Sequence, residues 1–201
     1  MEEGGDMGEL DPRQVRTRTA LHRAVLETVE RTPLADVSVA AIARAAGISR
    51  DTFYRHAASV AEVLATALAE RLDAAVAEFA TFEGPARERF ERGEHRLFAH
   101  VAQHRAVYLN AMAPGLAEPV RGVLVGRIEQ ALAEYLDTHP DVAPIAAGHL
   151  SRAEHHALYA AYGAAGTVGV IEHWLRAGAV GDADDIARST LAVSAPWWWA
   201  D

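Results

Sequence analysis

Residues 39–56 read VAAIARAAGISRDTFYRH, and this stretch decides how the first part of the chain folds. Its spacing predicts one helix over residues 38–46 and a second, shorter helix over residues 50–57. Between them, Gly47 can adopt the left-handed conformation that ends a helix, which most other residues disfavour. Ile48 then supplies an apolar side chain that fills the angle between the two helices. The sequence therefore predicts a helix-turn-helix unit.

Within this unit the side chains divide into a buried set and an outward set. Ser38 and Ser49 precede the two helices, and serine is a favoured residue at an N-cap. Ile42 and Phe53 fall on the apolar side, and we assign both to the core on their spacing. The outward side of the second helix carries Arg50, Thr52, Tyr54 and His56.

A short polar helix held at an angle to its predecessor is the element that helix-turn-helix proteins insert into the major groove of DNA. Arg50 can reach guanine O6 and N7 or a phosphate, and both roles stay open. Tyr54 and His56 are expected to donate to phosphates, because neither side chain matches one base pair. Thr52 would touch a thymine methyl group or a phosphate. The candidate DNA-binding residues are Ser38, Val39, Arg44, Ser49, Arg50, Thr52, Tyr54 and His56.

The first helix of the unit offers further contacts at its beginning and near its end. Ser38 and Val39 can present backbone N–H groups to a phosphate at the positive end of the helix dipole. Arg44 offers another phosphate contact or an ion pair with a nearby acid, and the sequence leaves both open.

The charge is distributed unevenly along the chain. The net charge is -9, which taken alone argues against a nucleic-acid partner. Residues 12–57, however, carry eight basic and four acidic side chains, whereas residues 58–201 carry eleven and nineteen. Residues 1–11 carry five acids and no base. A basic module therefore lies between a short acidic segment and a longer acidic body.

Composition excludes several classes of protein. The chain has 201 residues, of which 50% are apolar and 23% charged, a balance typical of a globular protein. It has no cysteine, which excludes disulfides and thiolate chemistry. The longest uncharged run, residues 157–171, is shorter than the roughly 20 residues of a membrane-spanning helix. The N-terminal segment lacks the basic start and apolar stretch of a secretory signal, so we expect a cytoplasmic protein.

Helical spacing recurs along the chain, and strand signals are nearly missing. Glycine and proline interrupt the pattern into about nine helices, three of them short and near the N-terminus. The predicted fold class is all-α: a three-helix DNA-binding head followed by a larger helical domain. The expected divisions are an acidic disordered tail at 1–12, the helix-turn-helix domain at 13–58 and the larger domain at 59–201.

Residues 39–56 resemble the DNA-binding signature of the TetR family of bacterial transcriptional regulators. The resemblance requires the Ile42-Ala43 pair, the Ala46-Gly47 turn and Thr52-Phe53-Tyr54 in one register, and it covers roughly residues 13–72. Residues 166–175 are similar to the penultimate helix of many such regulators. Two positions depart from the pattern: Ala57 stands where the family usually has an aromatic residue, and Val60 where it often has lysine.

A single head covers one half-site, so such proteins are expected to bind palindromic DNA as homodimers. We expect the dimer to form through the last two helices. The alternative is that both helices only close the core of the monomer. The predicted contact residues on the penultimate helix are Ala157, Ala161, Ala164, Val168, Ile171 and Leu175, and on the last helix, over residues 182–194, they are Ile186, Thr190, Leu191 and Val193.

The resemblance also implies that a small-molecule effector binds inside the larger domain. The candidate ligand-binding residues are Phe79, Phe98, Val101, Tyr108, Met112, Tyr135, Tyr159 and Tyr162. An aromatic residue at helical spacing is more often a packing residue, so only three or four of these are expected to touch a ligand. Such an effector would act by binding two conformations of the protein unequally.

The chain has ten histidines, which are common ligands of metal ions. His100 and His104 are four residues apart, a spacing that can ligate zinc, but no glutamate follows His100 as the hydrolytic HExxH motif requires. We therefore predict no metal site, no cofactor and no enzymatic activity. The alternative is a helical metal-dependent hydrolase or a histidine-based metal sensor. A third possibility keeps the fold but makes the protein an adaptor without affinity for DNA.

The sequence thus predicts a sequence-specific transcriptional regulator that binds double-stranded operator DNA. We expect it to be a repressor and a homodimer, controlled by a small-molecule effector in the larger domain.

Overall fold

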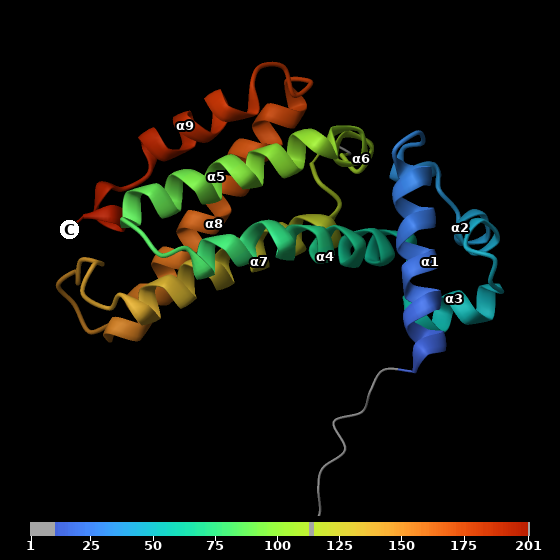
Figure 1. Cartoon of the computed structure of the whole chain (residues 1–201), viewed down its shortest axis with the longest axis horizontal. Helices are drawn as coiled ribbons and strands as arrows, with labels where there is room; N and C mark the ends of the chain where they lie inside the picture. Colours follow the sequence, from blue (N-terminus) through green and yellow to red (C-terminus); the bar gives the residue numbers. More distant parts are fainter. Residues whose placement is uncertain (1–10, 113–114, 201) are drawn as a thin grey trace, which may run out of the picture.

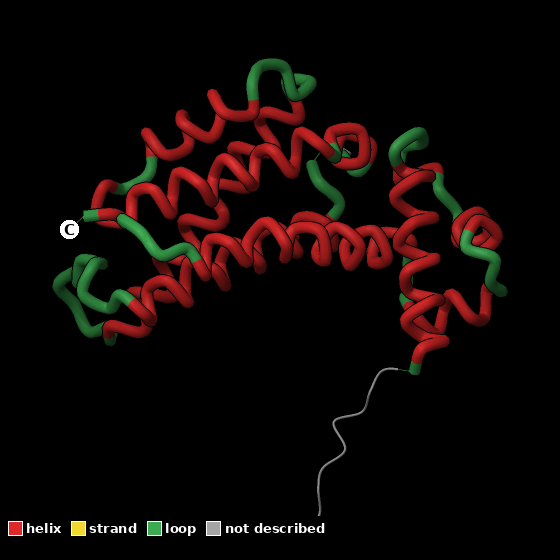
Figure 2. Tube along the Cα trace, in the orientation of Figure 1, coloured by secondary structure: helices red, strands yellow, loops and turns green. Residues whose placement is uncertain are grey.

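The computed structural model describes residues 11–112 and 115–200, whose regular structure is helical throughout (Figure 2). The predicted all-α class is confirmed, with nine α-helices and two short 3₁₀ helices in the described ranges. The α-helices are α1 (Pro12–Val29), α2 (Val39–Ala45), α3 (Arg50–His56), α4 (Val60–Thr81), α5 (Ala86–Gln103), α6 (Arg105–Asn110), α7 (Glu118–Thr138), α8 (Arg152–Arg176) and α9 (Ala183–Val193). The 3₁₀ helices are Leu34–Asp36 and Pro196–Trp199.

Helices α1, α2 and α3 form the head. Helix α1 has 18 residues, so the expectation of three short helices near the N-terminus is wrong for this one. Its apolar stripe continues far enough to span the whole head. Ser38 and Ser49 cap α2 and α3 as expected, because each hydroxyl accepts a bond from a backbone N–H two or three residues into the helix. These caps fix where both short helices begin.

The turn between α2 and α3 depends on Gly47. Its φ angle is +70°, in the left-handed region that glycine occupies without a Cβ clash. The N–H of Ile48 then donates to the carbonyl of Ala43 at 2.9 Å, which closes the end of α2. The Ile48 side chain is partly buried against the core. The helix-turn-helix therefore folds from the local features that the sequence indicated.

Helices α4 to α9 form the body. Figure 1 shows α4 leaving the head and running along the body, with α1 lying across its first turns. Helix α7 packs beside α4, α5 returns towards the head above α4, α8 packs against α7, and α9 packs against α5. The C-terminus lies at the end of the body farthest from the head (Figure 1).

One apolar core runs from the head into the body without a break. It includes Phe53 of the head, Leu64 and Leu68 of α4, and Val168 and Ile171 of α8. Among the described residues, the head therefore shares its core with α4 and has no separate core of its own.

The consecutive tryptophans close the far end of the body. Trp198 is buried and lies against Phe90 of α5, and its carbonyl accepts a 2.9 Å hydrogen bond from the Tyr135 hydroxyl. Trp197 stacks on Trp198 with ring centroids 4.3 Å apart. This segment therefore stabilises the contact of α5 with α7.

The acidic segment expected at residues 1–12 lies mostly outside the described residues. Asp11 is the N-cap of α1, and its side chain accepts a bond from the N–H of Arg13. Pro12 is the first helical residue, a position at which proline needs no N–H donor. A search of the described residues found no helix with the length and apolar character needed to cross a bilayer.

Candidate nucleic-acid interface

The outer face of α3 is the centre of the candidate interface. Tyr54 is 59% exposed, whereas its neighbour Phe53 is fully buried beneath it. The two rings meet edge to face with centroids 5.7 Å apart. Phe53 thus anchors the helix in the core and leaves the Tyr54 hydroxyl directed to solvent.

Two exposed arginines of the helix-turn-helix carry unpaired charge. Arg44 and Arg50 are exposed, and neither has an ion-pair partner among residues 11–112 and 115–200. The alternative that Arg44 pairs with a nearby acid therefore finds no support. Both guanidinium groups are available for phosphate or base contacts.

The hydroxyl groups of the two capping serines form hydrogen bonds within their own helices. The Ser49 hydroxyl caps α3 and lies 2.9 Å from the Thr52 hydroxyl. Thr52 is only half-buried, and its hydroxyl also accepts a 3.0 Å bond from Arg55 Nη2. Ser38 is exposed and Val39 half-buried at the start of α2. Contacts of these four residues with DNA stay predictions.

A polar groove between α1 and α3 extends the interface to residues that the sequence reasoning missed. It has a volume of about 460 Å³ and brings Arg13 and Thr17 of α1 and Arg55 of α3, which were not predicted, beside the predicted Thr52 and His56. The basic charge of residues 12–57 was the available signal, but linear spacing did not show that the start of α1 lies beside the end of α3. The groove adds two arginines to the candidate phosphate contacts.

This whole surface faces away from the body. Figure 1 shows α2 and α3 on the side of α1 opposite to α4–α9. Tyr54 and Arg50 of α3 are both exposed to solvent.

The body contains a separate, mainly apolar cavity of about 60 Å³. Helix α4 lines it with Leu72, Val76 and Phe79, α5 with Phe90, Gly93, Glu94 and Leu97, and α7 with Ile128, Ala131 and Leu132. Glu94 is the ionisable residue of this lining. Ligand sites in proteins are commonly about 300 to 1,000 Å³, so a ligand larger than a few atoms would have to move side chains here.

A comparison with family models identifies the head. Residues 24–67 match the model described as bacterial regulatory proteins of the tetR family. This range covers the last third of α1, the helix-turn-helix and the first turns of α4. The head is therefore similar to the DNA-binding region of TetR-family proteins. A search of curated proteins found no match.

Solved structures of TetR-family proteins share the fold of the chain. A TetR-family regulator from Streptomyces coelicolor is 22% identical, with 87% of this chain and 81% of that chain covered and a TM-score of 0.58. A TetR regulator from Rhodococcus sp. RHA1 is 19% identical, with 90% and 96% covered and a TM-score of 0.62. FadR of Thermus thermophilus, a TetR-family repressor solved with lauroyl-CoA, is 16% identical, with 88% and 92% covered and a TM-score of 0.64. At these identities the likeness concerns the fold.

The predicted effector residues do not converge on one cavity. Of the eight, Phe79 lines the cavity between α4, α5 and α7. Phe98, Val101 and Tyr108 are fully buried in the main core. Met112 is partly buried against that core, while Tyr135 and Tyr159 belong to the cluster around Trp198. The lining expected from Tyr135 and Tyr159 is wrong for this cavity, because aromatic packing holds both rings beside the tryptophans.

The interior position expected for Tyr162 is also wrong. Its side chain is 84% exposed on α8. Ala164, Val168 and Ile171 occupy the other face of the same helix and are fully buried in the monomer. Helix α8 therefore has two apolar faces. Of the stripe assigned to the dimer from sequence, the part from Ala164 to Leu175 closes the core of the monomer, whereas Ala157 is exposed.

Glu94 is the residue of the body that the sequence reasoning missed. Its Oε2 atom is buried with no hydrogen-bond partner, although the residue as a whole is only half-buried. Burial raises the pKa of the carboxyl group to about 7, and a side-chain hydrogen bond with Thr167 opposes the shift. The available signal was its position, because Glu94 lies four residues after Phe90 and three before Leu97 on the buried stripe of α5.

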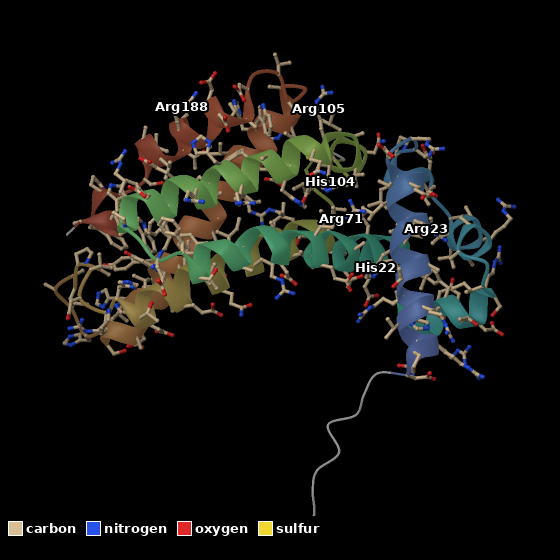
Figure 3. The ribbon with its side chains drawn as sticks, in the orientation of Figure 1. His22, Arg23, Arg71, His104, Arg105 and Arg188 are labelled. Carbon is tan, nitrogen blue, oxygen red and sulfur yellow. The ribbon has the colours of Figure 1, made fainter. Side chains whose placement is uncertain are left out.

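The histidines form polar links between helices. His100 Nε2 lies 3.0 Å from the Tyr108 hydroxyl, and His104 Nε2 lies 3.3 Å from Arg71 Nη1 across the space between α4 and α6 (Figure 3). Burial and the neighbouring His104 and Arg71 lower the pKa of His100 to about 4. Within the described ranges, no group of three potential ligands could hold a metal ion. The metal-dependent alternative therefore has no candidate centre in this part of the chain.

Proposed function

We propose that the protein is a repressor that binds palindromic operator DNA as a homodimer and responds to a small-molecule effector in its body. The observation that carries the proposal is the outer face of α3, where Tyr54 and Arg50 are exposed while Phe53 fixes the helix in the core. The unpaired Arg44 and the groove with Arg13 and Arg55 support a positively charged path for the DNA backbone.

Effector control would act through contacts that join the head to the body. Glu70 of α4 lies 3.0 Å from His22 Nδ1 and 3.3 Å from Arg18 Nε, both on α1. Asn110 of α6 donates a 2.7 Å bond to the carbonyl of Val29 at the end of α1. A ligand that separates α4 from α5 would shift these contacts and change the distance between the two heads of a dimer. If the ligand binds the two arrangements of the heads with unequal affinity, its binding changes the affinity of the protein for DNA.

The first test measures binding to a DNA fragment from the protein's own promoter region. Arg50→Ala is expected to weaken selection at one base pair in each half-site by about 1 to 3 kcal/mol, because it removes a guanine contact. Tyr54→Phe is expected to weaken binding similarly for all sequences, because it removes a hydroxyl that donates to phosphate. Electrophoretic mobility or fluorescence anisotropy with single-base operator variants distinguishes the two patterns.

A salt titration of the wild-type protein provides the control for that test. Contacts with phosphates release counterions, so affinity should fall steeply as salt is raised. Equal loss by Arg50→Ala across every operator variant contradicts its base contact, and an absence of binding at low salt supports the adaptor alternative.

The second test concerns the dimer, for which the exposed face of α8 and α9 is the candidate surface. Tyr162 is 84% exposed on α8 and Val193 is 81% exposed on α9. Leu158 lies one turn before Tyr162 and is also exposed, which makes an apolar stripe along the outside of α8. A two-fold axis beside this stripe would pack α8 and α9 of one subunit against the same two helices of its partner.

We expect Tyr162→Glu to weaken dimerisation by about 2 kcal/mol or more, since a carboxylate would lose its hydration in the interface. Analytical ultracentrifugation measures the change in the dimer dissociation constant. Val15→Glu introduces the same charge at an exposed apolar residue of α1 and should leave the dimer intact. If both variants stay dimeric, the dimer uses another surface.

A further inference from the structure

Glu94 places a carboxyl group at the wall of a cavity that is otherwise apolar. The cavity lies between α4, α5 and α7, and its remaining lining consists of aliphatic residues, Gly93 and the rings of Phe79 and Phe90. Thr167 of α8 forms a side-chain hydrogen bond with the carboxyl group. The Oε2 atom has no partner among the described residues. One buried acceptor atom therefore remains without a hydrogen-bond donor.

Burial of a carboxyl group is unfavourable unless a hydrogen-bond donor or a cation pairs with its free oxygen. An ionised carboxylate in an apolar environment costs several kcal/mol when no counterion is present, and the usual response is protonation. The two influences on the pKa of Glu94 are burial and the Thr167 bond, neither of which is a neighbouring positive charge. With a pKa of about 7, the carboxyl group can ionise near neutral pH at little cost if a cation arrives.

The aromatic side chains of the cavity fit the same kind of ligand. The rings of Phe79 and Phe90 meet at 80° with centroids 5.1 Å apart, so one presents its edge to the other. The face of an aromatic ring attracts a cation within about 6 Å. An ammonium group beside a carboxylate and a phenyl face is stabilised by both. A carboxylate or phosphate group would instead be repelled by ionised Glu94.

We propose that the cavity recognises a small apolar molecule that carries a protonated amine, and that Glu94 Oε2 receives its ammonium group. This assignment rests on the proposed function, because it names the class of effector that the regulator would bind. The apolar part of the ligand would lie against α4 and α7, while the ammonium group would donate to Glu94.

Phe79 is the side chain whose movement would make room for the ligand. A Cβ atom at Gly93 would lie 2.8 Å from Phe79 Cδ2, so the ring rests against the bare backbone of α5. Phe79 is only partly buried, and rotation away from Gly93 would enlarge the cavity at the junction of α4 and α5. Entry of a ligand at this junction would therefore act on α4, the helix that carries Glu70 and its contacts with α1.

The experiment compares three probes with the same alkyl chain and different head groups: octylammonium, 1-octanol and octanoate. Isothermal titration calorimetry at pH 8 measures their binding to the full chain. We expect the wild-type protein to bind octylammonium at least about tenfold more tightly than the other two, a difference of about 1.4 kcal/mol. Glu94→Gln should abolish this preference and bring the three affinities within about threefold, because an amide keeps the shape but not the charge.

Glu88→Gln is the matched control, since Glu88 lies on the same helix and is exposed. It should keep the preference for octylammonium. Equal preference in the wild type and Glu94→Gln overturns the proposal, as does tighter binding of 1-octanol or octanoate by the wild type. Failure of the wild type to bind any of the three probes also overturns it.

Operator binding, measured separately, distinguishes this proposal from the proposed function. Wild-type protein that binds DNA but no probe contradicts the amine site and leaves the regulator intact. Glu94-dependent binding of octylammonium by a protein that binds no DNA supports the site and contradicts the regulator.

Discussion

Phe53→Ala is expected to lower the free energy of unfolding by about 3 to 5 kcal/mol and to abolish binding to every DNA sequence. Phe53 is fully buried in the core that joins the head to α4, and its removal leaves a cavity there. Since α3 has only seven residues, tertiary packing rather than helix propensity holds it in place. Urea denaturation followed by circular dichroism measures the loss of stability.

Tyr54→Ala is the matched control for this prediction. It removes the neighbouring aromatic ring, but that ring is mostly exposed, so stability should fall by less than about 1 kcal/mol. Phe53→Leu retains most of the buried volume and should lose about 1 kcal/mol while it still binds DNA. Equal destabilisation by Phe53→Ala and Tyr54→Ala would show that α3 is not anchored by Phe53.

The head was predictable because its signals are local. Ser38 and Ser49 determine where two helices begin, and Gly47 determines where the first one ends. Each of these effects operates within four residues, so one sequence is sufficient to recognise it. The groove between Arg13 and Arg55 depends instead on how α1 crosses α3, which no local pattern determines.

The body was less predictable because periodicity shows that a face is apolar but not what covers it. Val168 and Tyr162 lie on different faces of α8, and both faces are apolar. One closes the core of the monomer and the other is exposed. The aromatic residues expected around an effector similarly pack against one another, as Tyr135 does with Trp198. Which rings meet is decided by the arrangement of helices that are distant in sequence.

Glu94 was overlooked for a related reason. Helix α5 is rich in charged residues, and a charge on such a helix is usually solvated. Its spacing from Phe90 and Leu97 places Glu94 on the buried side all the same. A carboxylate on an apolar stripe is unfavourable for folding, so its presence indicates a role that stability alone does not explain.

The stability gained by Glu94→Gln is expected to depend on pH in a way that measures this burial. The folded pKa of Glu94 is about 7, above the value of 4.5 that applies to an unfolded chain. Between these values the folded protein keeps a proton that the unfolded chain has lost, so wild-type stability falls as pH rises. The free energy of unfolding of Glu94→Gln relative to wild type should therefore increase by up to about 3 kcal/mol between pH 4.5 and 7 and be constant outside that range.

Denaturation of both proteins at a series of pH values tests this expectation, and the difference between them isolates Glu94. His100 has the opposite influence, because its folded pKa of about 4 lies below its usual 6.5 and its contribution to stability is lost as pH falls through that interval. That contribution is common to wild type and Glu94→Gln and cancels in the difference. Glu88→Gln, at an exposed position of the same helix, should give a difference that does not vary with pH. A flat difference for Glu94→Gln as well would mean that water reaches its carboxylate, and the cavity would then lack the unpaired acid on which recognition of an amine depends.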